Sequence, residues 1–180
     1  MENFKHKSVF RRGAEDGVWF GIYLSALFIF SALSLNIPFL GHIATLMSLA
    51  VPIYVFFILR KGYIENGYFY TFSEMWTHGI ILFFCGSLFM AASVVMYMKW
   101  INPNFIVDLF QTAIDAYRQI GNATGNEIAS TFENAIKQNA LPSSFSLAGN
   151  LISFSVFSGS ILSIILTIII RRITPKKDVI

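Results

Sequence analysis

The sequence predicts an all-α, polytopic membrane protein with four transmembrane helices and an extracytoplasmic amphipathic helical hairpin between the third and fourth. Three features predict it: four long apolar runs, basic residues gathered in alternate connections, and apolar stripes in the longest connection. Crossing the roughly 30 Å core of a bilayer takes about 20 helical residues, with about 17 near the lower limit. We therefore expect the 180 residues to form a single membrane domain with spans at 17–35, 43–59, 75–98 and 151–170.

The first span follows a basic N-terminal segment, as in a signal peptide, but its apolar run exceeds the roughly 7 to 15 residues of a signal peptide. We interpret it as an uncleaved span. Small residues recur at every fourth position in this span and in the fourth, which lets helix backbones approach closely in lipid. The two seams are Gly13, Gly17, Gly21 and Ser25, and Ser155, Gly159, Ser163 and Thr167. Three partners fit such seams: each other, another span of the same chain, or a second copy.

The second span contains Pro52, which lacks a backbone N–H group and is expected to kink the helix. Ser48, one turn earlier, can help to satisfy the backbone group that the proline leaves free. A kink of this kind serves as a hinge in a transporter, or it simply sets the shape of the helix.

Ionisable residues gather where the first and third spans begin, which is the same predicted side of the membrane. Glu15 and Asp16 start the first span, while Glu74 and His78 lie one helical turn apart at the start of the third. Such groups can relay a proton or bind a metal. They can also cap the two helices and pair with nearby Arg and Lys residues, which requires no ligand. We expect this second role, with no metal, cofactor or catalytic residue, since no phosphate loop, serine elbow or HExxH motif occurs.

The connection between the third and fourth spans, about residues 102–142, is long enough to have a structure of its own. Asn102 and Pro103 are typical of a helix start, and apolar residues then recur at three- and four-residue spacing to Ile120. Residues 121–125 should break this helix, and a second stripe predicts a shorter helix that ends near Leu141. The stripes have three alternative fates: packing on each other and on the span ends, lying in the outer leaflet, or binding a partner.

The basic residues indicate how the spans are oriented. Most of them lie in the N-terminal segment, the second connection and the C-terminal segment: Lys5, Lys7, Arg11, Arg12, Arg60, Lys61, Arg171, Arg172, Lys176 and Lys177. Because basic connections stay in the cytoplasm, both termini are expected there and the hairpin outside. The net charge of +3 therefore reports membrane topology, and we expect no nucleic-acid partner.

Two segments that flank the third span carry a resemblance to a known family. Residues 66–74 (NGYFYTFSE) lead into the span, residues 97–105 (YMKWINPNF) leave it, and a glycine-rich stretch enters the first span. With the four spans, these features make nearly the whole chain similar to the domain of unknown function 4199 family of bacterial membrane proteins. The resemblance implies a bacterial inner (cytoplasmic) membrane protein with an extracytoplasmic helical segment. It implies no activity, and hence no catalytic residue.

These observations leave three classes of function. The first is a structural or accessory membrane protein that presents its outer hairpin to a partner or to the bilayer, which fits spans poor in polar residues. The second is a small homo-oligomeric transporter or channel with the ionisable cluster at its mouth, although such proteins place polar groups along the membrane path. The third is a membrane enzyme, for which the sequence lacks a convergent catalytic set. We expect the first, without enzymatic activity, with the lipid bilayer and either a protein or a second copy as partners.

Overall fold

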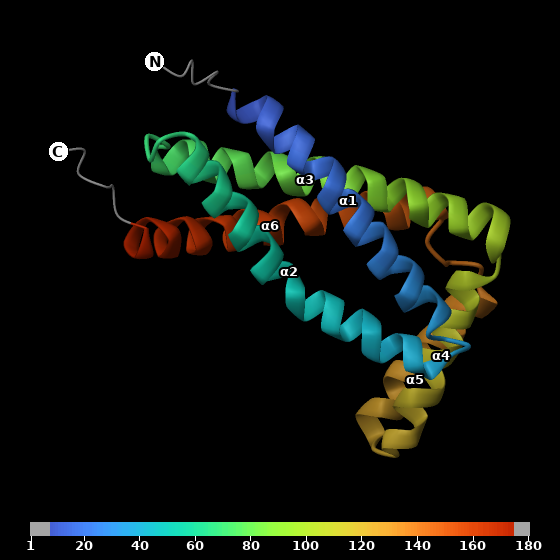
Figure 1. Ribbon diagram of the computed structural model, residues 1–180. Helices are drawn as coiled ribbons and strands as arrows, with labels where there is room; N and C mark the ends of the chain where they lie inside the picture. The colour runs from blue at the N-terminus through green and yellow to red at the C-terminus, as the bar shows by residue number, and fades with distance from the viewer. Residues whose placement is uncertain (1–7, 175–180) are drawn as a thin grey trace.

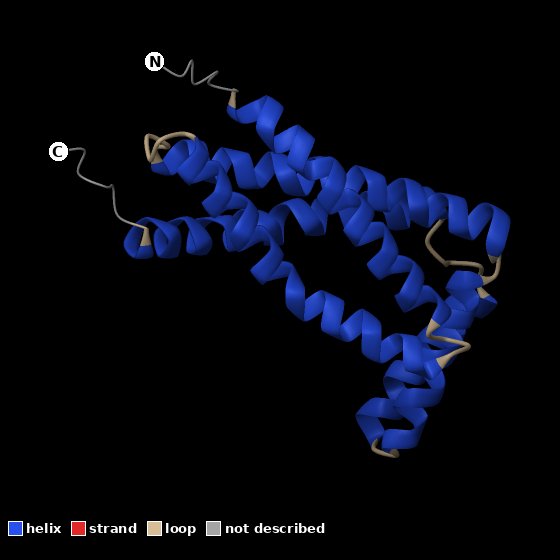
Figure 2. Cartoon of the chain, viewed as in Figure 1, coloured by secondary structure: helices blue, strands red, loops and turns tan. Residues whose placement is uncertain are grey.

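The computed structural model describes residues 8–174, which are helical apart from short connections (Figure 2). No strand occurs in this range. Four stretches are long and apolar enough to cross a membrane: Val9–Leu33, Pro38–Glu65, Phe72–Ile101 and Ser144–Ile173. The prediction of an all-α membrane protein with four spans is confirmed. Four residues used in the orientation argument lie outside the described residues: Lys5, Lys7, Lys176 and Lys177.

Helices α1 (Val9–Leu33), α3 (Phe72–Met96) and α6 (Ser144–Ile173) each begin before the expected apolar run, after a residue whose side chain caps the helix. Helix α1 begins well before residue 17. Ser8 caps its start, and the Ser8 hydroxyl accepts a hydrogen bond from the N–H group of Arg11 at 3.3 Å. Helix α3 begins after Thr71, which forms a reciprocal capping box with Glu74. The other elements are α2 (Pro38–Glu65), the π-helix η1 (Tyr97–Ile101), α4 (Phe105–Ile120) and α5 (Ala123–Lys137).

Helix α3 is the central helix of the bundle, and both α1 and α6 pack against it. Figure 1 shows the start of α1, the α2–α3 connection and the end of α6 together at one end of the bundle, called the termini end below. The α1–α2 connection and the α4–α5 hairpin lie at the opposite end, the hairpin end. One core cluster joins the four spans, and a second joins α1 and α3 to the base of the hairpin.

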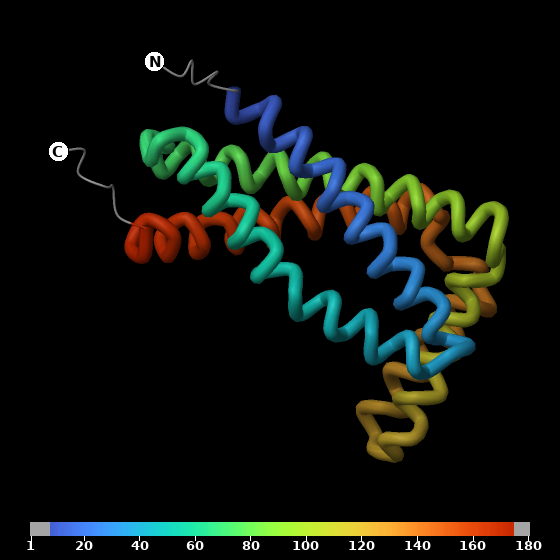
Figure 3. Tube along the Cα trace, in the orientation of Figure 1, coloured from blue at the N-terminus to red at the C-terminus, as the bar shows by residue number. Residues whose placement is uncertain are grey.

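Helix α2 packs on the bundle chiefly over its second half. Val55 and Leu59 are fully buried there, whereas Leu46 and Leu49 in the first half are 68% exposed. Pro52 lies inside the helix between these two parts. Figure 3 shows that α2 changes direction about midway along its length, as an internal proline leads one to expect.

The π-helix η1 continues α3 directly and was not predicted from the sequence. The N–H group of Asn102 donates to the carbonyl of Tyr97 at 2.9 Å, the five-residue spacing of a π-turn. The Tyr97 ring lies edge-on to those of Phe28 and Phe105, at centroid distances of 5.7 and 5.4 Å. This irregular turn therefore connects the third span to the base of the hairpin.

Candidate functional site

The glycine seam of α1 lies against α3. A Cβ atom placed on Gly17 would come 2.6 Å from the Cβ of Cys85, and one on Gly21 would come 2.7 Å from the Cβ of Phe89. Gly13 has an equally close neighbour on α3. Non-bonded carbon atoms prefer about 3.5–4.0 Å, so these positions have no room for a larger residue at the present helix spacing.

The seam of α6 also faces α3. A Cβ atom on Gly159 would come 2.1 Å from the Cγ of Phe83, and one on Gly79 would come 2.5 Å from the Cβ of Ser163. The Ser163 hydroxyl donates to the carbonyl of Gly159 at 2.7 Å and so serves its own helix. Of the partners that the sequence left open, both seams thus contact the third span of the same chain. The other seam residues are buried Thr167 and half-buried Ser25 and Ser155.

The ionisable cluster expected at the start of the first and third spans divides into separate contacts. His78 is fully buried, and its Nε2 lies 3.0 Å from Oδ2 of Asp16, which links α3 to α1. Glu15, next to Asp16, pairs instead with Arg11 one turn earlier at 3.0 Å. The close pair at this end of the bundle is therefore formed between two helices, by Asp16 and His78.

Glu74 serves the start of α3. Its Oε2 accepts a hydrogen bond from the N–H group of Thr71 at 2.7 Å and another from the Thr71 hydroxyl at 2.8 Å. A carboxylate in the first turn also interacts favourably with the helix dipole. Glu74 and His78 lie one turn apart, but His78 is directed to α1, so the two do not form the joint site that their spacing suggested.

Arg12 and Gly62 bring α2 into the same region, and Gly62 was not predicted from the sequence. The Arg12 guanidinium donates to the carbonyl of Gly62 at 3.1 Å and pairs with the carboxylate of Glu65. A Cβ atom on Gly62 would come 3.1 Å from Cε1 of His78, so glycine lets the imidazole lie against α2. In the sequence, the contact of His78 with α2 is indicated only by the presence of a glycine inside a helix, where glycine is normally unfavourable.

Several buried polar atoms at the termini end have no hydrogen-bond partner among the described residues. Such atoms are normally satisfied, and an unpaired one costs about 1–3 kcal/mol. They are Nε of Arg60, the hydroxyl oxygen of Tyr70, Nδ1 of His78, and Oγ1 of Thr167 and Thr174. The polar part of the bundle interior is therefore at this end, where water or a ligand has groups to bind.

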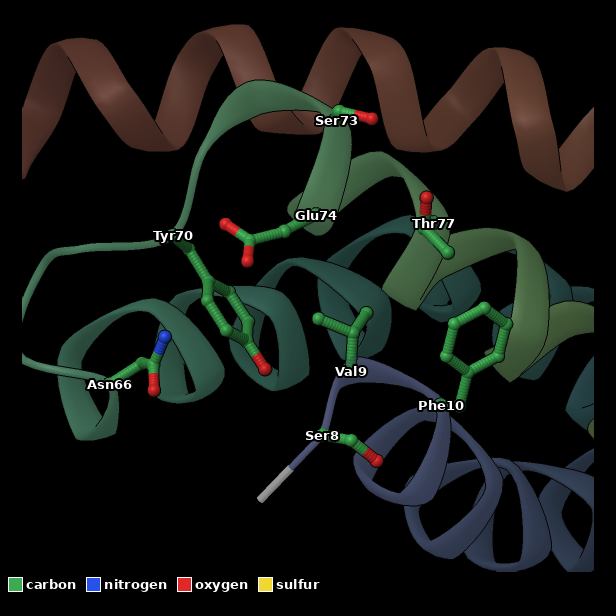
Figure 4. A pocket seen from close by; sticks show the side chains of 8 residues that line it. All are labelled: Ser8, Val9, Phe10, Asn66, Tyr70, Ser73, Glu74 and Thr77. Carbon is green, nitrogen blue, oxygen red and sulfur yellow. The ribbon is translucent and has the colours of Figure 1, made fainter. Parts of the chain in front are cut away.

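Two of the cavities at the termini end border α1 and contain ionisable residues of the expected cluster. The smaller, of about 200 Å³, lies between α1 and α2 and has charged residues of both signs, with Asp16 in its wall. The larger, of about 530 Å³, lies between the start of α1, the α2–α3 connection and the first turns of α3 (Figure 4). It is lined by Ser8, Val9, Phe10, Asn66, Tyr70, Ser73, Glu74 and Thr77.

Aromatic rings fill the interior beside the polar region. Phe20 is fully buried, and its ring contacts those of Tyr54 and Phe83 at centroid distances of 5.8 and 5.0 Å. Tyr23 stacks on Tyr54 at 5.2 Å and donates its hydroxyl hydrogen to the carbonyl of Met47 at 2.5 Å. This tyrosine ties α1 to α2 near the bend. The packing here is apolar apart from single hydroxyl groups.

Helices α4 and α5 form a closed hairpin. Gly121, with φ of +70°, ends α4 in the left-handed conformation that suits glycine, and the Asn122 side chain starts α5 by accepting from the N–H group of Gly125 at 2.6 Å. The break is therefore shorter than the expected residues 121–125, because Asn122 caps the next helix at once. On the inner faces, the Phe132 ring contacts that of Phe110 at a centroid distance of 5.2 Å.

The base of the hairpin is seated on the ends of the spans. Phe105 and Ile106 are buried in a cluster with Ala32 of α1 and Val94 of α3. The apolar stripes thus face each other and the bundle, which corresponds to the first of their three expected fates.

Comparison with known proteins identifies one family. The model of a family described as "Protein of unknown function (DUF4199)" matches residues 15–172, which include the second and third spans, the hairpin and most of the first and fourth spans. No curated protein and no solved structure matches the chain.

Proposed function

The chain belongs to the DUF4199 family of proteins of unknown function, and from its geometry we propose that it is an accessory protein that presents the α4–α5 hairpin to a protein partner. In this proposal the protein lies in the bacterial inner membrane, has no enzymatic activity, and has both termini in the cytoplasm. The observation that supports it is that the hairpin is a preformed unit on the bundle.

The hairpin holds its shape through contacts of its own. The rings of Phe110 and Tyr117 on α4 lie against Phe132 on α5, at centroid distances of 5.2 and 6.0 Å. Arg118 and Glu133 form an ion pair across the two helices. Because these contacts exist before any partner binds, association needs little ordering of the hairpin, which lowers the entropic cost of binding.

The outward surface of the hairpin is mostly polar and is acidic in places. Asp108, Asp115 and Glu127 are exposed along the two helices. A helix that lies in a leaflet needs a broad apolar face toward lipid, and here the apolar stripes are turned inward. Large apolar side chains that are exposed on the described hairpin are limited to Val107, Leu109 and Ile120. This surface fits a protein partner with hydrogen-bonding or basic groups better than it fits the bilayer.

The distribution of basic residues supports the proposed orientation. Positively charged helix ends are retained in the cytoplasm. The described basic residues at the termini end are Arg11, Arg12, Arg60, Lys61, Arg171 and Arg172. The hairpin, by contrast, has Arg118 and Lys137 as its described basic residues, and Arg118 is paired.

A small homo-oligomeric transporter or channel is the alternative function. The pair formed by the half-buried Asp16 and the fully buried His78 favours it, since ionisable groups at membrane depth commonly serve transport. The aromatic packing around Phe20 favours the accessory role, because transport paths are normally lined by polar groups and this part of the interior is filled by rings.

Affinity isolation of the full chain from its own membranes in mild detergent tests the proposal. The hairpin variant carries Asp115→Lys and Glu127→Lys, which reverse exposed charges without touching the packed rings. The control carries Arg171→Glu, an exposed charge reversal at the termini end. We expect a stoichiometric protein to co-purify with the unmodified chain and the control and to be lost from the hairpin variant. Equal recovery with all three, or self-association alone, contradicts the proposal.

A further inference from the structure

The larger cavity at the termini end has the composition of a binding site. Its wall contains the carboxylate of Glu74, the hydroxyl groups of Ser8, Ser73 and Thr77, and the ring of Phe10. No Lys or Arg is among its described lining residues. Figure 4 shows that these residues come from two helix starts distant in the sequence. The cavity between them has a volume of about 530 Å³. The described part of the cavity wall is thus rich in hydroxyl groups and contains one carboxylate and two aromatic rings, those of Phe10 and Tyr70.

A buried group without a partner is directed into this cavity. Tyr70 is 3% exposed, and its hydroxyl oxygen has no hydrogen-bond partner among the described residues. Figure 4 shows its ring in the cavity wall, with the hydroxyl pointing toward the start of α1 near Val9. Buried hydroxyl groups in native proteins normally have a partner, so this one is available to a bound molecule.

Two helix N-termini meet at the same cavity. In α1, Ser8 accepts from the N–H groups of Arg11 and Arg12, and in α3, Thr71 accepts from those of Glu74 and Met75. The first two N–H groups of each helix are left without an acceptor in the helix itself. Such N–H groups, at the positive end of the helix dipole, favour an anionic oxygen such as that of a phosphate.

The position of the cavity selects an amphiphile as its ligand. It lies at the ends of α1 and α3, two of the spans, where the apolar helix surface meets the polar cluster. Headgroups of membrane lipids occupy this level of a bilayer. We propose that the cavity binds the headgroup of a phospholipid that carries both a phosphate and a primary ammonium, as in the ethanolamine class.

Each part of that headgroup has a complement in the wall. A carboxylate has about four acceptor sites, so Glu74 can bind an ammonium while it caps α3. The ring of Phe10 adds a face for a cation. The phosphate has the N–H groups at the two helix starts and the hydroxyl group of Tyr70. A choline headgroup has no N–H to donate to Glu74, and a glycerol headgroup has no cation, so both should bind more weakly.

Lipid competition on the delipidated full chain in mild detergent tests this site. Short-chain lipids with ethanolamine, choline or glycerol headgroups are added, and native mass spectrometry counts the bound lipid. We expect ethanolamine lipid to be favoured, and Glu74→Gln to lower that preference about tenfold, the loss of one charge-assisted hydrogen bond. Glutamine keeps the capping box, so the helix start is preserved. Glu65→Gln, a carboxylate of the same end but outside this cavity, should leave the preference unchanged.

Tyr70→Phe gives an independent reading because it removes only the unpaired hydroxyl. We expect it to weaken ethanolamine-lipid binding several-fold while the chain stays folded. Equal binding of the three lipids, strongest binding of the glycerol lipid, or a preference untouched by Glu74→Gln would overturn the proposal. Loss of the preference on deleting residues 2–7, with Glu74 intact, would assign recognition to the N-terminal segment and overturn it as well.

Discussion

Replacement of Gly17 by alanine should force α1 and α3 apart. The new Cβ atom would lie 2.6 Å from the Cβ of Cys85 and 3.2 Å from the carbonyl oxygen of Leu82. Neither atom can swing away, because one is fixed to the α3 backbone and the other is part of it. Reaching an ordinary contact of about 3.5–4.0 Å requires the helices to separate by roughly 1 Å.

The expected change in unfolding free energy for Gly17→Ala is the sum of two opposing terms. Overpacking of this kind costs about 1–3 kcal/mol. Alanine regains up to about 1 kcal/mol of helix propensity relative to glycine. Gly149→Ala in α6 carries only the helix-propensity gain, because nothing lies within 4 Å of a Cβ atom placed there, so comparison with it isolates the cost of overpacking. The difference in unfolding free energy between the two variants should therefore be about 1–3 kcal/mol, with Gly17→Ala the less stable.

Equilibrium unfolding in mixed micelles, followed by circular dichroism, measures this difference. A second substitution, Cys85→Gly, removes the nearest atom and should restore part of the stability, with a coupling energy of about 1 kcal/mol or more in a double-mutant cycle. If Gly17→Ala is tolerated as well as Gly149→Ala, or if Cys85→Gly gives no rescue, the close approach of α1 and α3 is not what stabilises the bundle.

Two further substitutions test contacts at the termini end and near the bend in α2. Asp16→Ala should lower the unfolding free energy by about 1–3 kcal/mol, because it leaves the buried His78 without its partner. Asp16→Asn should lower the unfolding free energy less. Equal melting temperatures of the two variants would count against the pair. Tyr23→Phe should cost about 0.6–1 kcal/mol through loss of the hydrogen bond to Met47. An unchanged unfolding midpoint for Tyr23→Phe would show that this bond does not hold α2 to α1.

The spans could be predicted because bilayer thickness sets a length that apolar residues must cover. The helix ends could not be read from the same signal. Helix α1 continues into polar sequence as far as the cap at Ser8, and α2 continues to Glu65, since backbone hydrogen bonds persist where hydropathy falls. The π-turn after α3 also has no hydrophobic signature. Its first residue, Tyr97, packs against Phe28 and Phe105, which are distant from one another in the sequence.

The candidate site depended on the register between helices, which one sequence does not contain. Spacing alone placed Glu74 beside His78, but the approach of α1 at Gly13 and Gly17 brings Asp16 to the imidazole instead. The small-residue seams predicted close helix packing. They did not predict which helix each seam contacts, because that also depends on the register between helices. The side chains of α3 that face the two seams include large ones. The third span therefore has no row of small residues that would identify it as their partner.

The central claim is that the hairpin lies on the opposite side of the membrane from the helix ends rich in Arg and Lys. Labelling of single cysteines in intact cells tests this claim most directly. In a Cys85→Ala background, Thr124→Cys places a thiol on the hairpin and Lys61→Cys places one at the termini end, and both positions are exposed. We predict that a membrane-impermeant thiol reagent labels the cysteine at position 124 in intact cells and the one at position 61 only after permeabilisation. Labelling of both from the same side would contradict the account.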